Sequence, residues 1–276
     1  MKKPSIIILA ILIILILLFP QQTPLTNIQA EPTSTPLNHV YFNIIHGRFF
    51  LYMQPTQQPT AEGYPIIFLF HGASQHAFSW LIGLNKWNKN QMSFATEALD
   101  NGFFLILLES NRPIRPGPRA WDVFTTNNSA NNDIQYIQSI LSWLNQSQLP
   151  VNMDSVFCAG FSSGAFMCSR LALNYEHLFN AIAVNSGCNA ESITLSQRGP
   201  VFDIHSSYNL SADHPPTILL HGQRDQLVPV QCATNYYQDL RNSSVETQIL
   251  IAPTHGHIWL SAYNQDILNW FSKQIQ

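Results

Sequence analysis

Apolar positions along the chain fall into two kinds of pattern, continuous runs and helical faces. The runs at 64–70 and 103–108 are typical of strands buried on both faces of a parallel sheet. Between 133 and 145, apolar side chains recur at helical spacing, at Ile134, Ile137, Ile140, Leu141 and Leu144. The same patterns predict strands at 64–70, 103–108, 156–160, 181–184, 217–220 and 247–251, and helices at 88–101, 133–145, 163–176, 229–241 and 258–275. Strands that alternate with helices indicate an α/β fold with a doubly wound, mostly parallel sheet. Residues 185–216 show neither pattern, so we expect them to be irregular.

The N-terminal 30 residues have the pattern of an export leader. Lys2 and Lys3 precede an apolar run over 6–19, which is shorter than the roughly 20 residues that a membrane span needs. We predict a signal peptide over 1–30, cut after Ala30, with an uncleaved N-terminal anchor as the alternative. The mature chain is then expected to be secreted or periplasmic.

The rest of the chain predicts a single domain. Residues 31–38 are a polar lead-in, and 39–45 and 48–53 form a β-hairpin around the turn His46-Gly47. No linker or internal repeat divides the residues after the hairpin. We therefore expect one α/β domain over 39–276, with the hairpin at its N-terminal end.

Composition excludes some classes of partner. Charged residues make up only 11% of the 276 residues, while 46% are hydrophobic, so the chain is a folded domain with a largely neutral polar surface. The formal net charge is −3, and loss of Lys2 and Lys3 with the leader would bring it to −5. Because no basic run is present, we expect no nucleic-acid partner, and contact with a membrane only through an uncleaved leader.

The four cysteines, Cys158, Cys168, Cys188 and Cys232, match no zinc pattern, and we expect no metal. Cys158 lies in the predicted strand 156–160, and Cys168 lies in the predicted helix 163–176. From these positions we expect Cys158 and Cys168 to be small buried side chains rather than a bonded pair.

The segment Gly160-Phe161-Ser162-Ser163-Gly164 joins a predicted strand to a predicted helix. Such a tight turn holds its central residue in a strained backbone conformation and presents a small side chain beside the unpaired N–H groups of the helix start. Gly160 and Gly164 provide the space that the turn needs. We therefore predict that Ser162 is a nucleophile.

A serine hydroxyl needs a base to take its proton, and an imidazole base needs a carboxylate to orient it. Asp225 lies in a short loop just after a buried strand, although a turn-stabilising role is the alternative. His255 and His257 both follow the last strand, and His257 is favoured because it directly precedes the predicted closing helix. All of these groups sit at the carboxyl ends of strands, where sites form in open parallel sheets.

Two backbone N–H groups are needed to bind the developing oxyanion. We expect them from Ser163, at the helix start, and from Ala73, in the loop after 64–70, while His71 is expected to be structural. Trp80, Trp121 and Trp259 are expected to line the substrate pocket, with core packing as the alternative.

With these motifs the chain resembles the α/β-hydrolase superfamily and, within it, is similar to the secreted polyhydroxybutyrate depolymerase and feruloyl esterase group. The resemblance covers nearly all of the chain after about residue 40. It is carried by His71-Gly72-Ala73-Ser74, Trp121-Asp122, Gly160 to Gly164, Leu178-Phe179-Asn180-Ala181-Ile182-Ala183, His221-Gly222 through Asp225 to Val228-Pro229, and Gly256-His257-Ile258-Trp259.

The resemblance implies ester hydrolysis with Ser162 as nucleophile, Asp225 as acid and His257 as base, without a cofactor. The implied substrates are hydroxyalkanoate polyesters or oligomers, or feruloyl-type aryl esters. The resemblance also places Cys188 and Cys232 after neighbouring strands, where they can close a disulfide. A serine peptidase of the same superfamily and a catalytically inactive binding protein on this fold are the alternatives.

Overall fold

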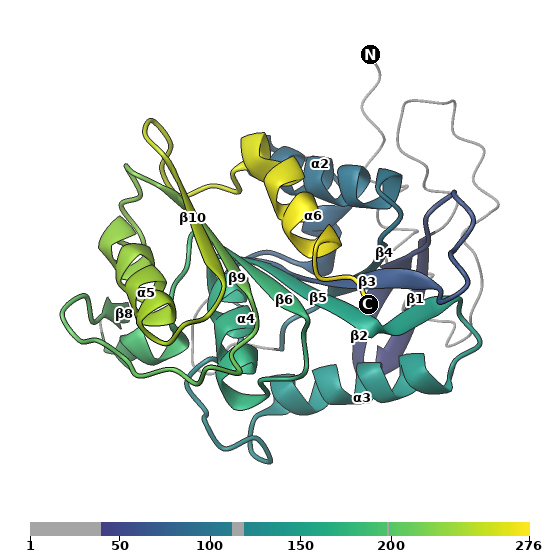
Figure 1. Cartoon of the computed structure of the whole chain (residues 1–276), viewed down its shortest axis with the longest axis horizontal. Helices are drawn as coiled ribbons and strands as arrows, with labels where there is room; N and C mark the ends of the chain where they lie inside the picture. Colours follow the sequence, from purple (N-terminus) through teal and green to yellow (C-terminus); the bar gives the residue numbers. More distant parts are fainter. Residues whose placement is uncertain (1–39, 112–118, 198) are drawn as a thin grey trace.

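The computed structural model describes residues 40–111, 119–197 and 199–276. The predicted leader and lead-in, 1–38, lie outside these described residues. Eight strands form one sheet in the order β1-β2-β4-β3-β5-β6-β9-β10 (Figure 1). They are β1 (Val40–Ile45), β2 (Arg48–Met53), β3 (Tyr64–Phe70), β4 (Phe104–Leu108), β5 (Val151–Phe161), β6 (Ala181–Asn185), β9 (Thr217–Gly222) and β10 (Thr247–Ala252).

The predicted fold class is confirmed. β1 and β2 form an antiparallel hairpin, β2 joins β4 antiparallel, and each remaining neighbour pair is parallel. The turn uses His46 and Gly47, whose φ values of 53° and 69° suit a tight hairpin turn. The hairpin therefore extends the parallel sheet at one edge.

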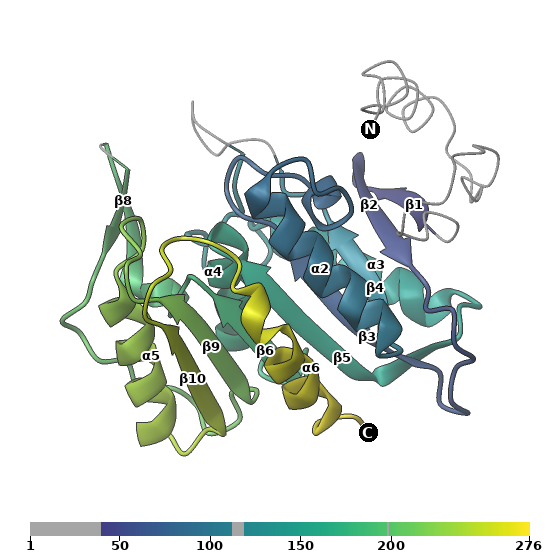
Figure 2. The same ribbon diagram turned by 90° about the horizontal axis from the view of Figure 1, so that it is seen from above.

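Helices cover both faces of the sheet (Figure 2). α2 (Lys86–Asp100) and α6 (Asn264–Ser272) pack in one apolar layer, and α3 (Asn132–Gln146), α4 (Ser163–Asn174) and α5 (Val230–Asn242) pack in the other. Strand β3 shows why its sequence is a continuous apolar run. Ile66 and Phe68 point into one layer, whereas Ile67 and Leu69 point into the other.

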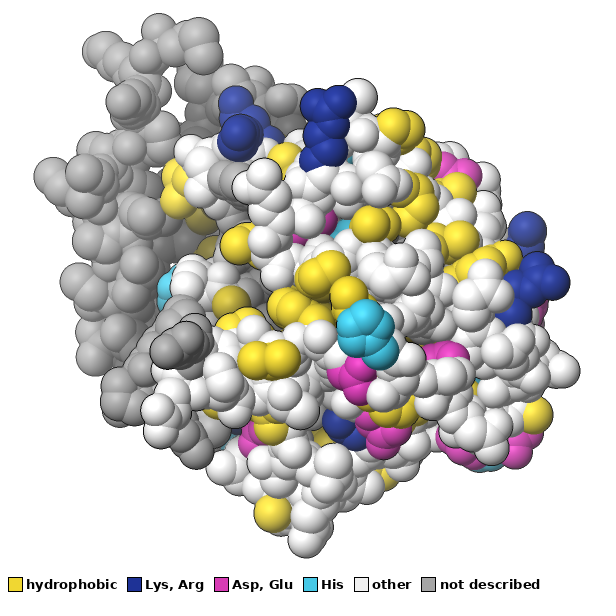
Figure 3. All heavy atoms as spheres, turned by 90° about the vertical axis from the view of Figure 1, so that its left-hand side faces the viewer, with side chains coloured by type: hydrophobic (Ala, Val, Ile, Leu, Met, Phe, Trp, Pro, Cys, Tyr) yellow, Lys and Arg dark blue, Asp and Glu magenta, His cyan; other side chains and the backbone are white. Residues whose placement is uncertain are grey.

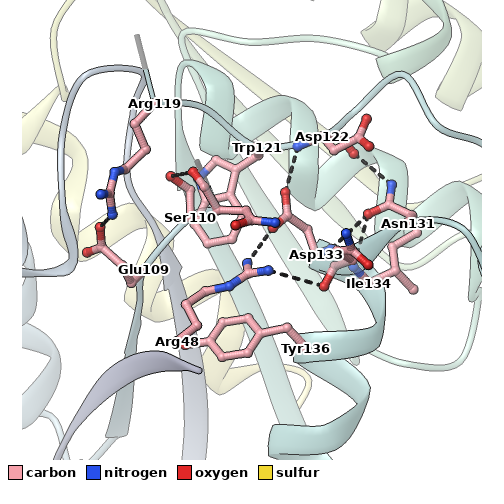
Figure 4. Close-up of polar contacts among 12 residues, drawn as sticks. Arg48, Glu109, Ser110, Arg119, Trp121, Asp122, Asn131, Asp133, Ile134 and Tyr136 are labelled. Atoms are coloured by element: carbon pink, nitrogen blue, oxygen red, sulfur yellow. Dashed lines mark hydrogen bonds and ion pairs between the residues drawn. The ribbon is translucent and has the colours of Figure 1, made fainter. Parts of the chain in front are cut away.

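The N-cap of helix α3 is Asn131, whose side chain accepts hydrogen bonds from the N–H groups of Asp133 and Ile134. The Asp133 carboxylate pairs with Arg48 of β2 and accepts the N–H of Asp122 at 2.6 Å, as Figure 4 shows. This pair ties the hairpin to α3.

Two segments differ from the expected secondary structure. The interval expected to be irregular contains a short helix, η3 (Ala190–Ser192), and an antiparallel hairpin of β7 (Ile193–Ser196) and β8 (Gly199–Phe202). The closing helix begins at Asn264, after the short helix η4 (Ser261–Tyr263), rather than at 258. Residues 258–260 cannot start that helix because Asn185 of β6 binds the carbonyl of Ile258 and the N–H of Leu260.

All four cysteines form disulfides. Cys188 bonds to Cys232, which confirms the expected pair. Cys158 bonds to Cys168, so the expectation that these two stay unpaired is wrong. The turn around Ser162 brings the end of β5 and the start of α4 together, so two cysteines only ten positions apart can meet although their spacing suggests no pair.

One face of the molecule is mainly neutral, as the composition suggests. Figure 3 looks onto the side of the molecule where α5 and β8 lie, and most of this face consists of uncharged polar groups and backbone. Apolar side chains gather near its centre, beside a histidine. Within the residues that the structure describes, no helix has both the length and the apolarity to cross a membrane.

Candidate active site

Ser162 stands at the turn between β5 and α4 in a conformation that few residues adopt, with φ 53° and ψ −118°. Backbone atoms of nearby residues leave no space for a side chain at Gly160 or Gly164, the two glycines on either side of Ser162. A Cβ atom on Gly160 would lie 2.3 Å from the carbonyl oxygen of Gly164, and one on Gly164 would lie 2.2 Å from that of Phe70. The N–H of Ser162 donates to the carbonyl of Asn185 at 2.9 Å, which fixes the turn against β6.

A hydrogen-bonded chain runs from Ser162 to a buried carboxylate. Ser162 Oγ lies 2.8 Å from His257 Nε2, and His257 Nδ1 lies 2.8 Å from Asp225 Oδ2. Since the carboxylate only accepts, Nδ1 carries the proton and the serine hydroxyl donates to Nε2. The Ser162, His257 and Asp225 side chains therefore have the order and spacing of a nucleophile, a base and an orienting acid.

The Asp225 side chain is fully buried and held by four donors. Oδ1 accepts the N–H groups of Leu227 and Val228 at 2.9 and 3.0 Å, and Oδ2 faces His257 and His221. Burial alone would raise the pKa of Asp225, but the hydrogen bonds from His221 and His257, the charge of His257 and the Val228 N–H together hold this pKa well below its usual range. The carboxylate is thus ionised at neutral pH.

Of the two histidines in the loop after β10, His257 rather than His255 contacts Ser162. The His257 side chain is 12% exposed and its ring lies 5.1 Å from the ring of Phe161, beside the serine. His255 is exposed, and its carbonyl accepts the N–H of Arg224 at 2.9 Å. A Cβ on Gly222 would lie 2.4 Å from the carbonyls of His255 and Gly256, so the loops that carry Asp225 and His257 are in tight contact.

The two N–H groups expected to bind an oxyanion follow neighbouring strands, with Ala73 in the loop after β3 and Ser163 at the start of α4, after β5. Among the described residues, neither the Ala73 nor the Ser163 N–H has a hydrogen-bond partner. The segment 119–121 contacts both places, because the Arg119 carbonyl accepts the N–H of Ser74 at 2.8 Å and the Trp121 N–H donates to Ser163 Oγ at 3.1 Å.

A buried carboxylate anchors that segment. Glu109, just after β4, pairs with the Arg119 guanidinium and accepts the N–H of Ala77 at 2.9 Å (Figure 4). Its other partner is His76 Nδ1, at 3.0 Å. The ion pair thus connects the loop that contains Ala73 to the loop that contains Trp121.

Comparison with known proteins places these motifs in a family. A model of the phospholipase/carboxylesterase family matches residues 122–275, which include the serine turn and both loops that complete the hydrogen-bonded chain. The chain belongs to this family. Its structure has the fold of the α/β-hydrolase esterases.

Two curated relatives are depolymerase- and esterase-type proteins. A poly(3-hydroxyoctanoate) depolymerase from Pseudomonas fluorescens is 28% identical over 236 residues, 83% of this chain and 81% of that protein. Feruloyl esterase B from Thermothelomyces thermophilus is 28% identical over 192 residues, 61% of this chain and 62% of that protein. These relatives agree with the resemblance inferred from the motifs.

Solved structures agree on the fold. A ferulic acid esterase superimposes with a TM-score of 0.61 at 15% identity, over 83% of this chain and 92% of that one. An acylaminoacyl peptidase from Pyrococcus horikoshii gives 0.59 at 14% identity, over 85% of this chain but only 41% of the peptidase. The chain thus spans less than half of that peptidase, and these likenesses concern the fold.

The three tryptophans expected to line the pocket lie in the core of this carboxylesterase-family chain. Trp80, Trp121 and Trp259 are each 1% exposed. Trp80 and Trp259 pack edge to face at 4.9 Å, and Trp121 Nε1 donates to the carbonyl of His71 at 2.8 Å. Their burial favours the alternative of core packing and gives no support to substrate contact.

His71 is structural in this arrangement, as expected. Its Nδ1 donates to the carbonyl of Gly72 at 2.7 Å, and its Nε2 accepts the N–H of Ser110 at 3.1 Å. Burial lowers the pKa of His71 to about 4, more than the nearby Glu109 raises it. The ring is therefore neutral and braces the end of β3.

Sequence reasoning assigned no role to three residues around the site: Glu109, Asn185 and His221. Each lies at or next to the end of a buried strand, which is the one feature of the sequence that marks them. Asn185 holds both sides of the segment after His257, and Glu109 holds the segment beside Ser163. Their partners come from distant parts of the chain, so local pattern did not reveal them.

Proposed function

We propose that this protein is a serine esterase that hydrolyses carboxylic esters through an acyl-enzyme on Ser162. The observation that carries the proposal is the continuous chain of 2.8 Å contacts from Ser162 Oγ through His257 to Asp225. Membership of the phospholipase/carboxylesterase family supports the same reaction class.

The geometry supports a two-step reaction. His257 Nε2 takes the proton of Ser162 as Oγ attacks the ester carbonyl, and Asp225 stabilises the positive charge that forms on the imidazole. His257 then returns the proton to the leaving alcohol, which departs and leaves the acyl group on Oγ. Water, deprotonated by the same nitrogen, releases the acid and restores the serine.

The tetrahedral oxygen needs fixed donors during both steps. The N–H groups of Ala73 and Ser163 are proposed to supply them, since neither has a partner among the described residues. The segment 119–121 holds both the loop that contains Ala73 and the start of α4 in place. Donors that are already oriented stabilise the charge without reorganisation.

The proposed substrates follow the relatives. One curated relative is named as a poly(3-hydroxyoctanoate) depolymerase and the other as a feruloyl esterase. We therefore propose hydroxyalkanoate oligomers or polyesters and feruloyl-type esters as the classes to test first. Export by a signal peptide over 1–30 belongs to the same proposal and would place the enzyme outside the cytoplasm.

Substitution of the nucleophile tests the reaction. Ser162→Ala should lower the rate of p-nitrophenyl butyrate hydrolysis at least about ten-thousand-fold, because the hydroxyl that forms the acyl-enzyme is lost. Ser142→Ala, at an exposed position of α3, is the matched control and should leave the rate unchanged. A fluorophosphonate should label the native chain and the Ser142→Ala variant but not Ser162→Ala.

A surviving wild-type rate in Ser162→Ala would disprove the assignment. A parallel assay with aminoacyl p-nitroanilides separates the esterase from a peptidase that uses the same three residues. Faster turnover of the anilides than of the esters would favour the peptidase.

A further inference from the structure

His221 is a buried histidine to which no part of the proposed reaction assigns a role. It is the penultimate residue of β9, it is followed by Gly222, and its side chain is 0% exposed. His71 stands at the matching place after β3, also before a glycine and also 0% exposed. The two His-Gly strand ends therefore allow a direct comparison.

The contacts of His221 fix its tautomer. Nε2 lies 3.0 Å from the carbonyl oxygen of Val228 and 3.3 Å from Asp225 Oδ2. An ionised carboxylate and a carbonyl only accept, so the proton of the neutral ring must be on Nε2 and be shared between these two oxygens.

This tautomer leaves the other nitrogen without a partner. Among the described residues, His221 Nδ1 is buried and makes no hydrogen bond, whereas both ring nitrogens of His71 are paired. A buried acceptor without a donor costs free energy, and an apolar side chain of similar volume would avoid that cost. The need for a donor at Nε2 explains why a histidine is present.

The hydrogen bonds to Asp225 show what the donor does. The two backbone N–H groups of Leu227 and Val228 both go to Oδ1. Oδ2, the oxygen that holds His257, is contacted by only one further described side chain, that of His221. Because the same Nε2–H also faces the Val228 carbonyl, His221 links the two ends of the loop that carries the acid.

We propose that His221 is a positioning residue for Asp225: its Nε2–H holds Oδ2 in the plane that His257 requires and keeps the 225–228 loop closed over β9. The proposal rests on the assignment of Asp225 as the acid of a serine esterase. His221 touches no substrate, and its effect passes through Asp225 to His257. The ionisable side chains that it faces in the described structure are Asp225, from the loop after β9, and behind it His257, from the loop after β10.

A pair of amide variants tests this role. In His221→Gln the amide nitrogen is as many bonds from Cβ as Nε2, so it can still donate to Oδ2, whereas in His221→Asn it is one bond too short. We expect His221→Asn to lower kcat for p-nitrophenyl butyrate by about 10- to 100-fold, the usual range for losing a hydrogen bond to a charged group, with KM within about twofold. His221→Gln should retain kcat within about threefold.

The pH profile gives a readout that packing alone would not move. A carboxylate that has lost a donor holds a proton on the neighbouring imidazole more strongly. The acidic limb of the kcat/KM profile should therefore move to higher pH in His221→Asn and return towards the wild-type position in His221→Gln. His214→Asn serves as control, since the His214 side chain is also buried but hydrogen-bonds to Pro215 and Tyr236, away from Ser162, His257 and Asp225. It should change melting temperature only.

Equal kcat values and pH profiles in His221→Asn and His221→Gln would overturn the proposal, and so would a loss in His221→Asn no larger than in His214→Asn at the same fraction folded. These outcomes are distinct from failure of the esterase assignment, in which the wild-type chain itself shows no Ser162-dependent turnover. If His221→Asn does not fold, a His221→Gln variant that folds but has lost kcat to the same 10- to 100-fold extent would equally contradict the role.

Discussion

At the scale of single residues, the turn around Ser162 depends on backbone contacts that leave no space for side chains at Gly160 and Gly164. Ser162 has φ 53°, a conformation that is stable only when the surrounding chain enforces it. The enforcement comes from close backbone contacts: α4 starts so near the end of β3 that a Cβ on Gly164 would lie 2.2 Å from the carbonyl oxygen of Phe70. The glycine thus permits the contact that places the serine.

This contact predicts the effect of one added methyl group. Gly164→Ala should lower the free energy of unfolding by about 3 kcal/mol or more and reduce kcat, because backbone must move at the turn that carries Ser162. Gly102→Ala is the matched control: a Cβ there meets nothing within 4 Å, although φ is 84°. It should cost about 1–2 kcal/mol from backbone strain alone and leave kcat unchanged. Chemical denaturation and ester assays on both variants decide, and a fully active Gly164→Ala would contradict the prediction.

Contacts that follow from the order of the strands were predictable, and contacts that form only between folded loops were not. Ser162, Asp225 and His257 follow parallel strands of one sheet, so the sequence places them at one edge, where the structure brings them into contact. His221 also ends a strand, but its partner on Oδ2 is visible only once the 225–228 loop is folded. For Trp80, Trp121 and Trp259 the sequence left pocket wall and core packing open, and their burial favours the core.

At the scale of elements, the two disulfides fix different parts of the chain. Cys158–Cys168 joins β5 to α4 across the serine turn and spans ten positions, whereas Cys188–Cys232 joins the segment after β6 to α5 and spans 44. Loop closure in the unfolded chain predicts a stabilisation of about 3 kcal/mol for the shorter and about 4 kcal/mol for the longer. We therefore expect the Cys188→Ala/Cys232→Ala variant to be the less stable of the two double variants.

Activity should show the reverse order. Removing Cys158–Cys168 loosens the two elements that hold Ser162, so Cys158→Ala/Cys168→Ala should lose more kcat under conditions where both variants are folded. Denaturant unfolding and ester assays measure the two effects, and thiol titration of the denatured wild-type chain should find no free thiol before reduction. Four free thiols would refute the pairing. Equal losses of kcat in the two double variants would refute the prediction that Cys158–Cys168 holds the turn around Ser162.

Elements with a strong local pattern were predicted closely, and those fixed by distant contacts were not. β3 has the predicted bounds, because seven consecutive residues are apolar or nearly so and both faces are covered. The closing helix was expected too early because Asn185, at the end of β6, holds residues 258–260 in place. The β7–β8 hairpin was missed because each of its strands has only four residues, too few to establish a pattern in the sequence, and because Leu195 and Val201 are exposed rather than part of a core.

At the scale of the whole molecule, the two apolar layers on the faces of the sheet both stabilise the fold and hold the candidate site in place. Loops of β3, β5, β9 and β10 meet at the carboxyl edge, and two apolar layers on the sheet faces fix their spacing. The histidines at or near strand ends are enclosed by the same layers. His71 and His214 are 0% and 4% exposed, and each is paired through both ring nitrogens.

These two histidines predict how stability depends on pH. Burial lowers the pKa of His71 and of His214 to about 4, below the ordinary value of 6.5. Between about pH 4 and 6.5 the unfolded chain therefore binds more protons than the folded one, and the free energy of unfolding should fall as the pH is lowered, by about 1.4 kcal/mol per pH unit per histidine. Asp225, whose pKa is held low, loses its contribution only at pH values below this window. Guanidinium unfolding between pH 7 and 4.5 should show the slope, His214→Gln should remove about half of it, and His205→Gln, at an exposed position, should leave it intact. A wild-type free energy that stays constant over this range would show that these rings take up protons in the folded chain as readily as in the unfolded one.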